Sequence, residues 1–359
     1  MKGDIYKKLA KRLDMLPNGF PRTESGVELR LLEKMFKLEE AELAAEMHIH
    51  MEPAQKIASR TKMDPKEAYK TLKNMVRKGL IRIERKEREL RFSLMPFIVG
   101  FYEEQLPRLD QEMASLFEEY FQESKGAVAK NPVSVHRVIP VEESISFELE
   151  IFPYERASDM IKSAKSWGVR DCICRVQQQL IGKGCDHPVQ NCLVFAPVKG
   201  VFDNSEVDRA ITQEEALQIL HEAEKAGLVH TAGNYIGPHN YICNCCTCSC
   251  GILRSVAEFG IPTAVAKSDF LAQVDQEKCL GCEDCLPTCQ FGALSLSGDE
   301  CVVEDVKCVG CGVCATVCPS EALILIRRRE GDVEKPPATY KNWEARRAEE
   351  RGMPFEDLL

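Results

Sequence analysis

Two copies of one cysteine motif stand near the C-terminal end of the chain. Each copy has the spacing C-x2-C-x2-C-x3-C, and the second begins 29 residues after the first. Thiolates are soft ligands for metal ions and metal–sulfur clusters. Three of them at every third residue wrap a short loop around one centre and leave the fourth on the segment that follows. We therefore expect a pair of thiolate-bound centres, held by Cys279, Cys282, Cys285 and Cys289 together with Cys308, Cys311, Cys314 and Cys318.

The repeat resembles the bacterial two-cluster ferredoxins, in which proline follows the last cysteine of a motif, as Pro319 follows Cys318 here. The resemblance covers residues 269–327 and implies two 4Fe-4S clusters with crossed ligands. One departure is Gln290, which stands where the family usually has proline after the crossing cysteine. A pair of four-thiolate zinc sites is the alternative interpretation. The resemblance implies one cluster on Cys279, Cys282, Cys285 and Cys318, and a second on Cys308, Cys311, Cys314 and Cys289.

Nine further cysteines lie in two dense groups between residues 172 and 250. Structural core cysteines do not gather in this way, and neither a reducing compartment nor C-x-C spacing suits disulfides. We expect metal centres that draw ligands from both groups, namely one or two further 4Fe-4S clusters, or zinc. The remaining cysteine, Cys301, fits no motif, and we expect it to be a buried core thiol. The nine are Cys172, Cys174, Cys185 and Cys192, and then Cys243, Cys245, Cys246, Cys248 and Cys250.

The nine thiols would serve two four-ligand centres with one thiol to spare. Alternate side chains of an extended chain point to opposite sides. Cys246, Cys248 and Cys250 would then face one way, and Cys243 and Cys245 the other. A cluster with only three cysteines would leave an open iron for a substrate or a partner's ligand.

Four other residues near these cysteines are relevant to the metal centres. Arg175 and Lys183 are candidates to offset the negative charge of a reduced cluster, and surface solvation is their alternative role. His187 and His239 are candidate ligands other than thiolate.

Charge is unevenly distributed along the 359 residues, whose net charge is −9. Residues 1–95 carry 22 Lys and Arg against 15 Asp and Glu, a net charge of +7, so the remainder carries −16. The N-terminus lacks the apolar stretch of a signal peptide, and no apolar run approaches the roughly 18 residues of a membrane helix. We expect a cytoplasmic protein with reduced thiols, no membrane insertion, and separate tasks for its two ends.

The basic N-terminal segment reads as several helices followed by a strand–turn–strand pattern. In the clearest helix Asp64 is placed to cap the N-terminus, Pro65 follows it, and Gly79 is placed for a left-handed turn at the end. This order resembles a winged-helix domain at residues 25–95. Protein docking is the alternative role of such a domain, and DNA binding is the role in which the capped helix enters the major groove. The resemblance implies that this helix exposes Lys66, Lys70, Lys73, Asn74 and Arg77.

These patterns together predict an α+β multidomain chain. The expected parts are a helical, winged-helix-like domain at 1–95, a connecting helix at 96–130 with a break near Pro107, a cysteine-rich middle domain at 131–268, the ferredoxin-like domain at 269–327, and a polar tail at 328–359.

As a whole the chain resembles the multidomain 4Fe-4S ferredoxin-type proteins of anaerobes. The resemblance implies an electron-transfer component that relays single electrons between the C-terminal clusters and a middle-domain centre, with a redox protein as partner. A redox-responsive winged-helix DNA-binding transcription regulator is the alternative, and an oxidoreductase that acts at an open middle cluster is a third. No glycine-rich dinucleotide fingerprint, Walker loop or Ser/His/Asp set supports nicotinamide, flavin or nucleotide use.

Overall fold

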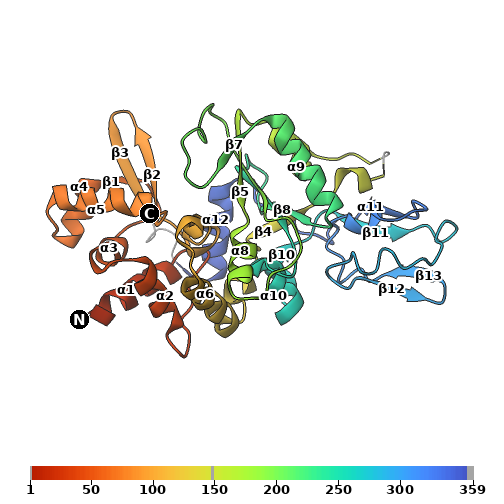
Figure 1. The fold of residues 1–359 in the computed structure, drawn as a ribbon, viewed down its shortest axis with the longest axis horizontal. Coiled ribbons are helices and arrows are strands. Elements are labelled where there is room, and N and C mark those ends of the chain that lie inside the picture. Colours follow the sequence, from red (N-terminus) through yellow and green to blue (C-terminus); the bar gives the residue numbers. More distant parts are fainter. Residues whose placement is uncertain (1, 147–148, 354–359) are drawn as a thin grey trace. The chain divides into compact units, whose positions relative to one another are not determined.

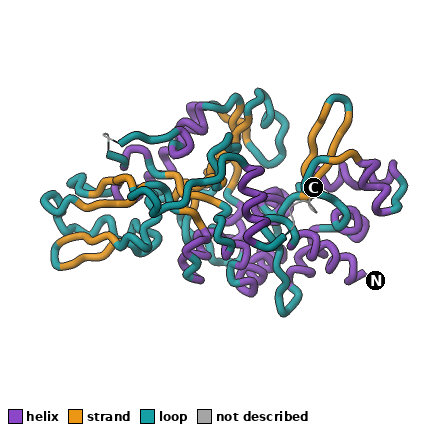
Figure 2. The backbone as a smooth tube through the Cα atoms, turned by 180° about the vertical axis from the view of Figure 1, so that it is seen from behind, coloured by secondary structure: helices purple, strands orange, loops and turns teal. Residues whose placement is uncertain are grey.

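The computed structural model describes residues 2–146 and 149–353, which form two compact units (Figure 1). The first unit comprises residues 2–132 with 180–182 and 344–353, and the second comprises the described residues from 133 to 343 apart from 180–182. Figure 2 shows mainly helices in the first unit and most of the strands in the second. The expected α+β multidomain class is therefore confirmed. No helix in the described ranges is long and apolar enough to cross a membrane.

The first unit has helices followed by a β-hairpin, as expected from its sequence. The hairpin strands are antiparallel, and Ile81 faces Leu94 while Ile83 faces Phe92. The short strand β1 pairs with β3, so the sheet order is β1-β3-β2. The elements are α1 (Lys2–Asp14), α2 (Val27–Met35), α3 (Leu38–Ala44), β1 (Glu52–Pro53), α4 (Ala54–Thr61), α5 (Pro65–Arg77), β2 (Ile81–Lys86) and β3 (Glu89–Leu94).

The two ends of helix α5 are set by a side-chain cap and by a glycine in a left-handed conformation. The Asp64 carboxylate accepts hydrogen bonds from the backbone N–H groups of Lys66 and Glu67 at 2.9 and 3.2 Å. Gly79 has φ +64°, and a Cβ there would lie 2.4 Å from the Cβ of Glu104. The predicted cap and left-handed turn are confirmed.

The outward face of α5 is basic, with one correction to the expected set. Lys66, Lys70, Lys73 and Arg77 are exposed. Asn74 is only half-exposed, and its side-chain amide donates a hydrogen bond of 2.7 Å to the Glu40 carboxylate. The side chain of Asn74 therefore serves the packing of the unit rather than its surface.

Glu40 is a buried carboxylate that joins α3 to the end of α5. It is 1% exposed, and both of its oxygens lie 2.7 Å from the Lys78 ammonium, in addition to the Asn74 bond. One carboxylate oxygen also accepts from the backbone N–H of Lys37 at 2.9 Å. Glu40 thus satisfies four donor contacts at one point in the core.

We expect Glu40→Ala to lower the free energy of unfolding of the first unit by about 3–5 kcal/mol, because it leaves the Lys78 charge and the Asn74 amide without their partner. Hydrogen exchange of the α5 amides, followed against denaturant, measures this change. Glu39→Ala, at the exposed neighbouring position, is the control and should change stability by less than about 0.5 kcal/mol. Equal protection in the two variants would contradict the role given to Glu40.

Residues 96–130 and the C-terminal tail are more structured than their composition suggests. An irregular turn at Phe97–Phe101 and a 3-10 helix at Glu103–Arg108, which contains Pro107, precede α6 (Gln111–Ser124), so the expected break is present. The expected polar tail contains α12 (Tyr340–Glu350). In it the fully buried Arg347 donates hydrogen bonds to the carbonyls of Pro17 and Val128 at 3.2 and 3.1 Å. Residues 344–353 of the tail thus belong to the first unit, and residues 328–343 belong to the second.

The second unit is built on a seven-stranded sheet of order β10-β4-β8-β9-β6-β5-β7. All neighbouring pairs are antiparallel except β10 and β4. The strands are β4 (His136–Ile139), β5 (Ser166–Asp171), β6 (Gln190–Ala196), β7 (Arg209–Ile211), β8 (Val229–Gly233), β9 (Tyr241–Cys245) and β10 (Val265–Ala266), and the helices are α7 (Ala157–Lys162), α8 (Ile173–Leu180), α9 (Gln213–Lys225) and α10 (Gly251–Phe259).

The two faces of this sheet are chemically different. One face packs Leu193, Phe195 and Ile242 against α7 and α9 in a hydrophobic core. Because side chains alternate along a strand, Cys192 and Cys243 point to the other face. Leu193 is paired with Ile242 in this antiparallel register. Cys192 precedes Leu193 and Cys243 follows Ile242, so the two cysteines lie across from each other on β6 and β9.

The segment that contains the repeated cysteine motifs is made of short strands and one short helix, drawn in blue in Figure 1. The segment has two short pairs of antiparallel strands. Ile145, which precedes this segment by more than a hundred residues, forms an isolated β-bridge to Leu325. The elements are β11 (Phe270–Val274) with β14 (Leu323–Arg327), β12 (Leu294–Ser297) with β13 (Glu300–Val303), and the short helix α11 (Val313–Thr316).

Candidate metal centres

Four cysteines of the repeat line one cavity. Its walls include Leu280, Ala322 and Leu323. The sulfur of Cys318 accepts a hydrogen bond from the backbone N–H of Ala322 at 3.3 Å, and the sulfur of Cys279 accepts one from Cys301 at 3.5 Å. An apolar cavity with convergent thiols and backbone donors fits a 4Fe-4S cluster. The thiols are Cys279, Cys282, Cys285 and Cys318, the set that crosses between the two motifs.

The other four cysteines of the repeat form a second group. Burial, followed by the negative charge of Cys308 and Cys289, raises the pKa of Cys311 to about 12. Burial and the same neighbours raise the pKa of Cys314. The sulfur of Cys289 accepts from the Ala293 backbone at 3.3 Å, which repeats the Cys318–Ala322 contact 29 residues earlier. The second group therefore has the same local construction as the first.

Glycine is required at the same position of both motifs. Gly281 and Gly310 have φ +62° and +71°, in the left-handed region that favours glycine. A Cβ on Gly281 would lie 2.5 Å from the carbonyl oxygen of Asp299, and one on Gly310 would lie 2.1 Å from that of Phe270. The loops can close around their thiols only without a side chain here.

Cys301 is buried, as expected, but it also belongs to the first cavity. Its sulfur lies 3.7 Å from the sulfur of Cys285, and its side chain lines the cavity. Sequence reasoning missed this contact because Cys301 lies on β13, outside both motifs.

Six of the nine middle cysteines form a closed ring of neighbouring thiols, in which each interacts with two others. Among the described residues, no three of the six sulfurs lie within 4.8 Å of one another, so the ring is wider than a site for a single ion. Two come from the β5–α8 junction, one from β6, two from β9 and one from the start of α10. Around the ring the order is Cys172, Cys174, Cys250, Cys245, Cys243 and Cys192, which closes on Cys172.

Two opposite members of this thiol ring, Cys172 and Cys245, have a lowered pKa. Hydrogen bonds from Cys174 and Cys192 lower the pKa of Cys172. Hydrogen bonds from Cys243 and Cys250 lower the pKa of Cys245 to about 6. Neighbouring thiols and burial raise the pKa of the other four members. The ring therefore contains two thiols that ionise more readily than the rest, and the thiolate is the form of cysteine that binds metal.

Two helices begin at the thiol ring. Cys172 immediately precedes α8, and Cys250 is the N-cap of α10. The backbone N–H of Arg175 donates to the Cys172 carbonyl at 3.0 Å, and that of Arg254 donates to the Cys250 carbonyl at 2.8 Å, so both cysteines stand at the start of a helical turn. Helix N-termini favour negative charge. The ring is therefore an environment suited to an anionic metal–thiolate centre.

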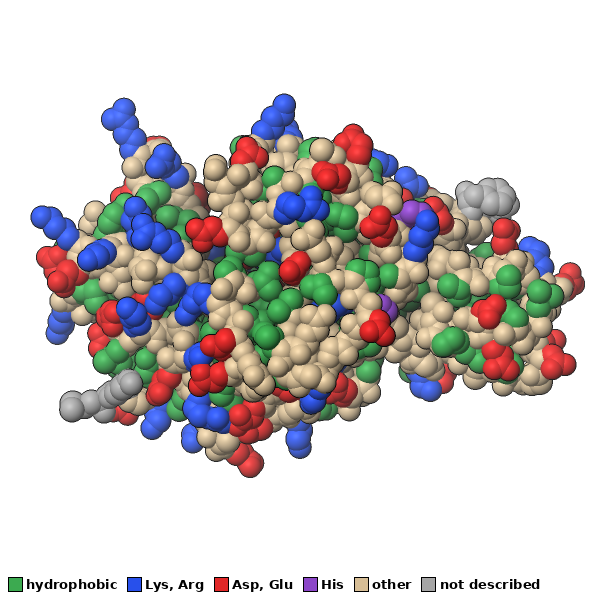
Figure 3. Space-filling view, viewed as in Figure 1, with side chains coloured by type: hydrophobic (Ala, Val, Ile, Leu, Met, Phe, Trp, Pro, Cys, Tyr) green, Lys and Arg blue, Asp and Glu red, His purple; other side chains and the backbone are tan. Residues whose placement is uncertain are grey.

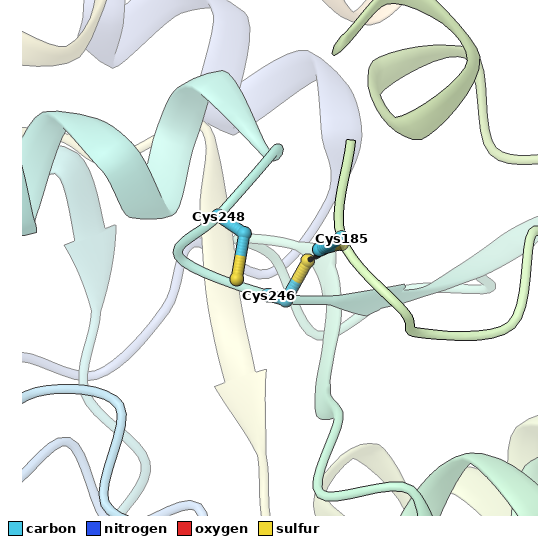
Figure 4. A group of neighbouring side chains, drawn as sticks. All are labelled: Cys185, Cys246 and Cys248. Atoms are coloured by element: carbon cyan, nitrogen blue, oxygen red, sulfur yellow. Dashed lines mark hydrogen bonds between the residues drawn. The ribbon is translucent and has the colours of Figure 1, made fainter. Parts of the chain in front are cut away.

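The remaining three middle cysteines form a separate group, which we call the thiol trio: Cys185, Cys246 and Cys248. Their sulfurs all lie within 4.8 Å of one another, and the distance from Cys185 to Cys246 is 3.9 Å. Figure 4 shows Cys246 and Cys248 on the turn between β9 and α10, and Cys185 on a different segment that approaches Cys246. Cys246 is buried, Cys185 is half-buried and Cys248 is exposed.

The nine thiols are thus divided into six and three, rather than into two sets of four with one to spare. The expected alternation places Cys246 with Cys248, as observed, but Cys250 lies in the ring with Cys245. The physical reason is that β9 ends at Cys245. The chain then turns, and Cys250 returns to the sheet face as the N-cap of α10.

The buried Arg175 lies between the two thiol groups. Its guanidinium donates to the side-chain oxygen of Asn191 and the carbonyl of Asn244, both at 2.9 Å. Burial works to lower its pKa, but the nearby Cys172 and Cys246 raise it above its ordinary value. The expectation that Arg175 offsets negative charge agrees with this position.

The two candidate histidine ligands do not join a ligand group. The ring of His239 stacks on Tyr235 at 4.7 Å between centroids. Among the described residues, neither His187 nor His239 belongs to a set of three close ligands. His48, His50 and Glu52 do form such a set, but Arg60 holds the Glu52 carboxylate and its positive charge opposes a cation.

Gln290 connects the repeat to the thiol trio. Its side-chain oxygen accepts from the backbone N–H of Thr247 at 2.7 Å, and its side-chain nitrogen donates to the carbonyl of Gly227 at 2.5 Å. Gln290 directly follows Cys289, and Thr247 lies between Cys246 and Cys248. The residue that departs from the ferredoxin pattern is therefore the one that links two groups of thiols.

Residues 278–322 match the family model of a 4Fe-4S dicluster domain. This stretch holds all eight motif cysteines and makes the chain an iron–sulfur protein with a general role in electron transfer. Neither the curated proteins nor the solved structures give a match to the chain.

Proposed function

We propose that this protein transfers single electrons between a redox partner, the two 4Fe-4S clusters of its dicluster domain, and an additional iron–sulfur centre at the thiol ring. The observation that carries the proposal is that the ring lies in the same compact unit as the dicluster domain. The clusters supply one-electron chemistry when bound. The proposed ligands are Cys279, Cys282, Cys285 and Cys318 for one cluster, Cys308, Cys311, Cys314 and Cys289 for the other, and Cys172, Cys174, Cys192, Cys243, Cys245 and Cys250 for the ring centre.

The chain itself contributes ligands, fixed dipoles and a rigid connection. The starts of α8 and α10 and the guanidinium of Arg175 favour negative charge at the ring. The Gln290 contacts hold the segment after Cys289 against Thr247, in the turn that follows β9, and against Gly227, between α9 and β8. These features support electron exchange within the second unit rather than through separate, freely moving domains.

The surface beside the first cavity supports docking of a redox protein. Leu280 is 70% exposed, and Cys282, Glu283 and Asp284 are exposed next to it. Figure 3 shows acidic and hydrophobic side chains at the end of the unit that carries β12 and β13. A partner with a basic rim around an apolar patch would be complementary to this surface. We propose that it docks here, in the cytoplasm, and that the protein is a component of an oxidoreductase system of anaerobic metabolism.

The basic face of α5 supports a second candidate function. Lys66, Lys70, Lys73 and Arg77 are exposed on one helix of a proposed winged-helix domain. Such a face suits the DNA backbone, so the alternative is a redox-responsive DNA-binding transcription regulator. Binding of the holoprotein to duplex DNA that weakens steeply with salt would favour this alternative. Docking of a protein is the other role that we propose for this domain, and it is compatible with electron transfer.

Iron content tests the electron-transfer proposal. We expect the anaerobically purified protein to contain more than the about eight irons of two 4Fe-4S clusters, with matching sulfide. Rapid mixing with a low-potential donor should reduce the clusters of the dicluster domain and the ring centre in resolved phases. About eight irons, with six ring thiols that remain free to react with an alkylating reagent after mild denaturation, would contradict the ring centre.

A further inference from the structure

The thiol trio has the spacing of ligands to a single metal ion. A tetrahedral zinc ion with Zn–S distances of about 2.3 Å holds its sulfurs about 3.8 Å apart. The sulfurs of Cys185 and Cys246 are 3.9 Å apart, and Cys248 lies within 4.8 Å of both. A cubane cluster binds each thiolate to a different iron, which spreads the sulfurs more widely. We propose that Cys185, Cys246 and Cys248 bind one zinc ion and leave its fourth position open for the thiolate of an external small molecule.

The trio lacks a fourth protein ligand. No other histidine, cysteine or carboxylate joins this group within the described parts of the chain. The neighbouring hydroxyl of Ser249 lies 3.5 Å from the Cys185 sulfur, and a neutral hydroxyl is a weak zinc ligand. Structural zinc sites are closed by four protein ligands, whereas sites that bind substrates have three and keep one position open. The open side is accessible because Cys248 is exposed.

A buried positive charge supports an anionic metal centre at this position. Three thiolates on a divalent ion leave one net negative charge. Arg175 is 1% exposed, and its Nε has no nitrogen or oxygen partner. Its guanidinium interacts with Cys246 of the trio as well as with the ring. A buried guanidinium requires a compensating charge, and the metal-bound thiolate of Cys246 would supply part of it.

A thiol is the ligand class that best fits the open position. Ala223, Leu228 and Ala226 pack beside Cys246 and Cys185, so the site has an apolar wall. Zinc deprotonates a thiol that coordinates it. Binding would break the bond from zinc to a water molecule, form a bond from zinc to sulfur, and release the thiol proton to solvent. No electrons are exchanged in this step, and it does not depend on the proposed ring centre.

Zinc X-ray absorption of the anaerobically purified full-length holoprotein tests this proposal. We expect one zinc ion per chain with three sulfur ligands and one oxygen or nitrogen ligand. Addition of 2-mercaptoethanol should change the set to four sulfurs. Absence of zinc after growth with zinc supplied, or four sulfurs without added thiol, would overturn the proposal.

Two cysteine variants separate this site from the ring centre. Cys248→Ser should lose the zinc and keep all of its iron, because the exposed side chain belongs only to the trio. Cys245→Ser should keep the zinc and lose iron. Loss of iron in Cys248→Ser would assign the trio to an iron–sulfur centre and overturn the zinc site, whereas an iron count of about eight with one zinc per chain would overturn only the ring centre.

Discussion

Cys245→Ser is expected to abolish the middle-domain iron–sulfur centre while the dicluster domain keeps its iron. Cys245 is buried on β9, and its pKa is lowered to about 6 by hydrogen bonds from Cys243 and Cys250. It is therefore one of the two ring members most ready to act as a thiolate ligand. A serine hydroxyl in its place stays protonated at neutral pH and cannot supply this charge.

The measurement is iron and sulfide per chain together with the electron paramagnetic resonance spectrum of the reduced protein. Cys245→Ser should remove the iron in excess of about eight per chain and the signals that belong to it. Cys314→Ser is the reciprocal variant and should lose dicluster iron only. Cys248→Ser is the matched control within the same ten-residue stretch and should leave iron unchanged. Unaltered iron in Cys245→Ser would show that the ring holds no cluster.

Gln290→Pro is expected to slow electron exchange between the dicluster domain and the ring centre by about tenfold or more. The variant loses the hydrogen bonds to Thr247 and Gly227. Both bonds are part-buried, and each contributes about 0.5–1.5 kcal/mol. Since 1.4 kcal/mol corresponds to a factor of ten in an equilibrium, the close arrangement of the two segments should become much less populated. The iron content should not change, because proline is the usual residue here in two-cluster ferredoxins.

Rapid-mixing kinetics with a low-potential donor measure the delay between reduction of the dicluster domain and reduction of the ring centre. Pro319→Gln is the matched control, because Pro319 occupies the position equivalent to Gln290 in the second motif. It should retain both clusters and the wild-type delay. An unchanged delay in Gln290→Pro would mean that the contact does not contribute to electron exchange.

Features that depend on neighbours in sequence could be predicted without a structure. The spacing of the eight motif cysteines is local, and the matched dicluster domain covers them. Asp64, Pro65 and Gly79 identify the two ends of α5, because caps and left-handed turns are set by one or two side chains. The hairpin of β2 and β3 follows from strict alternation over a few residues.

The division of the nine middle cysteines was decided only by the tertiary structure. Cys192 meets Cys243 because β6 pairs with β9 across about fifty residues of chain, and no local pattern specifies that register. Cys250 leaves the side of Cys246 because the strand stops and a helix begins. The burial of Arg347 in the tail and the link from Gln290 to Thr247 likewise join distant residues.

The sequence alone therefore determined which residues carry the chemistry, since cysteine type and short spacing are sufficient to indicate thiolate centres. Only the tertiary structure decided which of these thiols lie together, a ring of six and a trio. The physical reason is that metal ligation requires side chains within a few ångströms of one another. For residues far apart in the chain, that proximity is set by strand register and helix start points rather than by spacing.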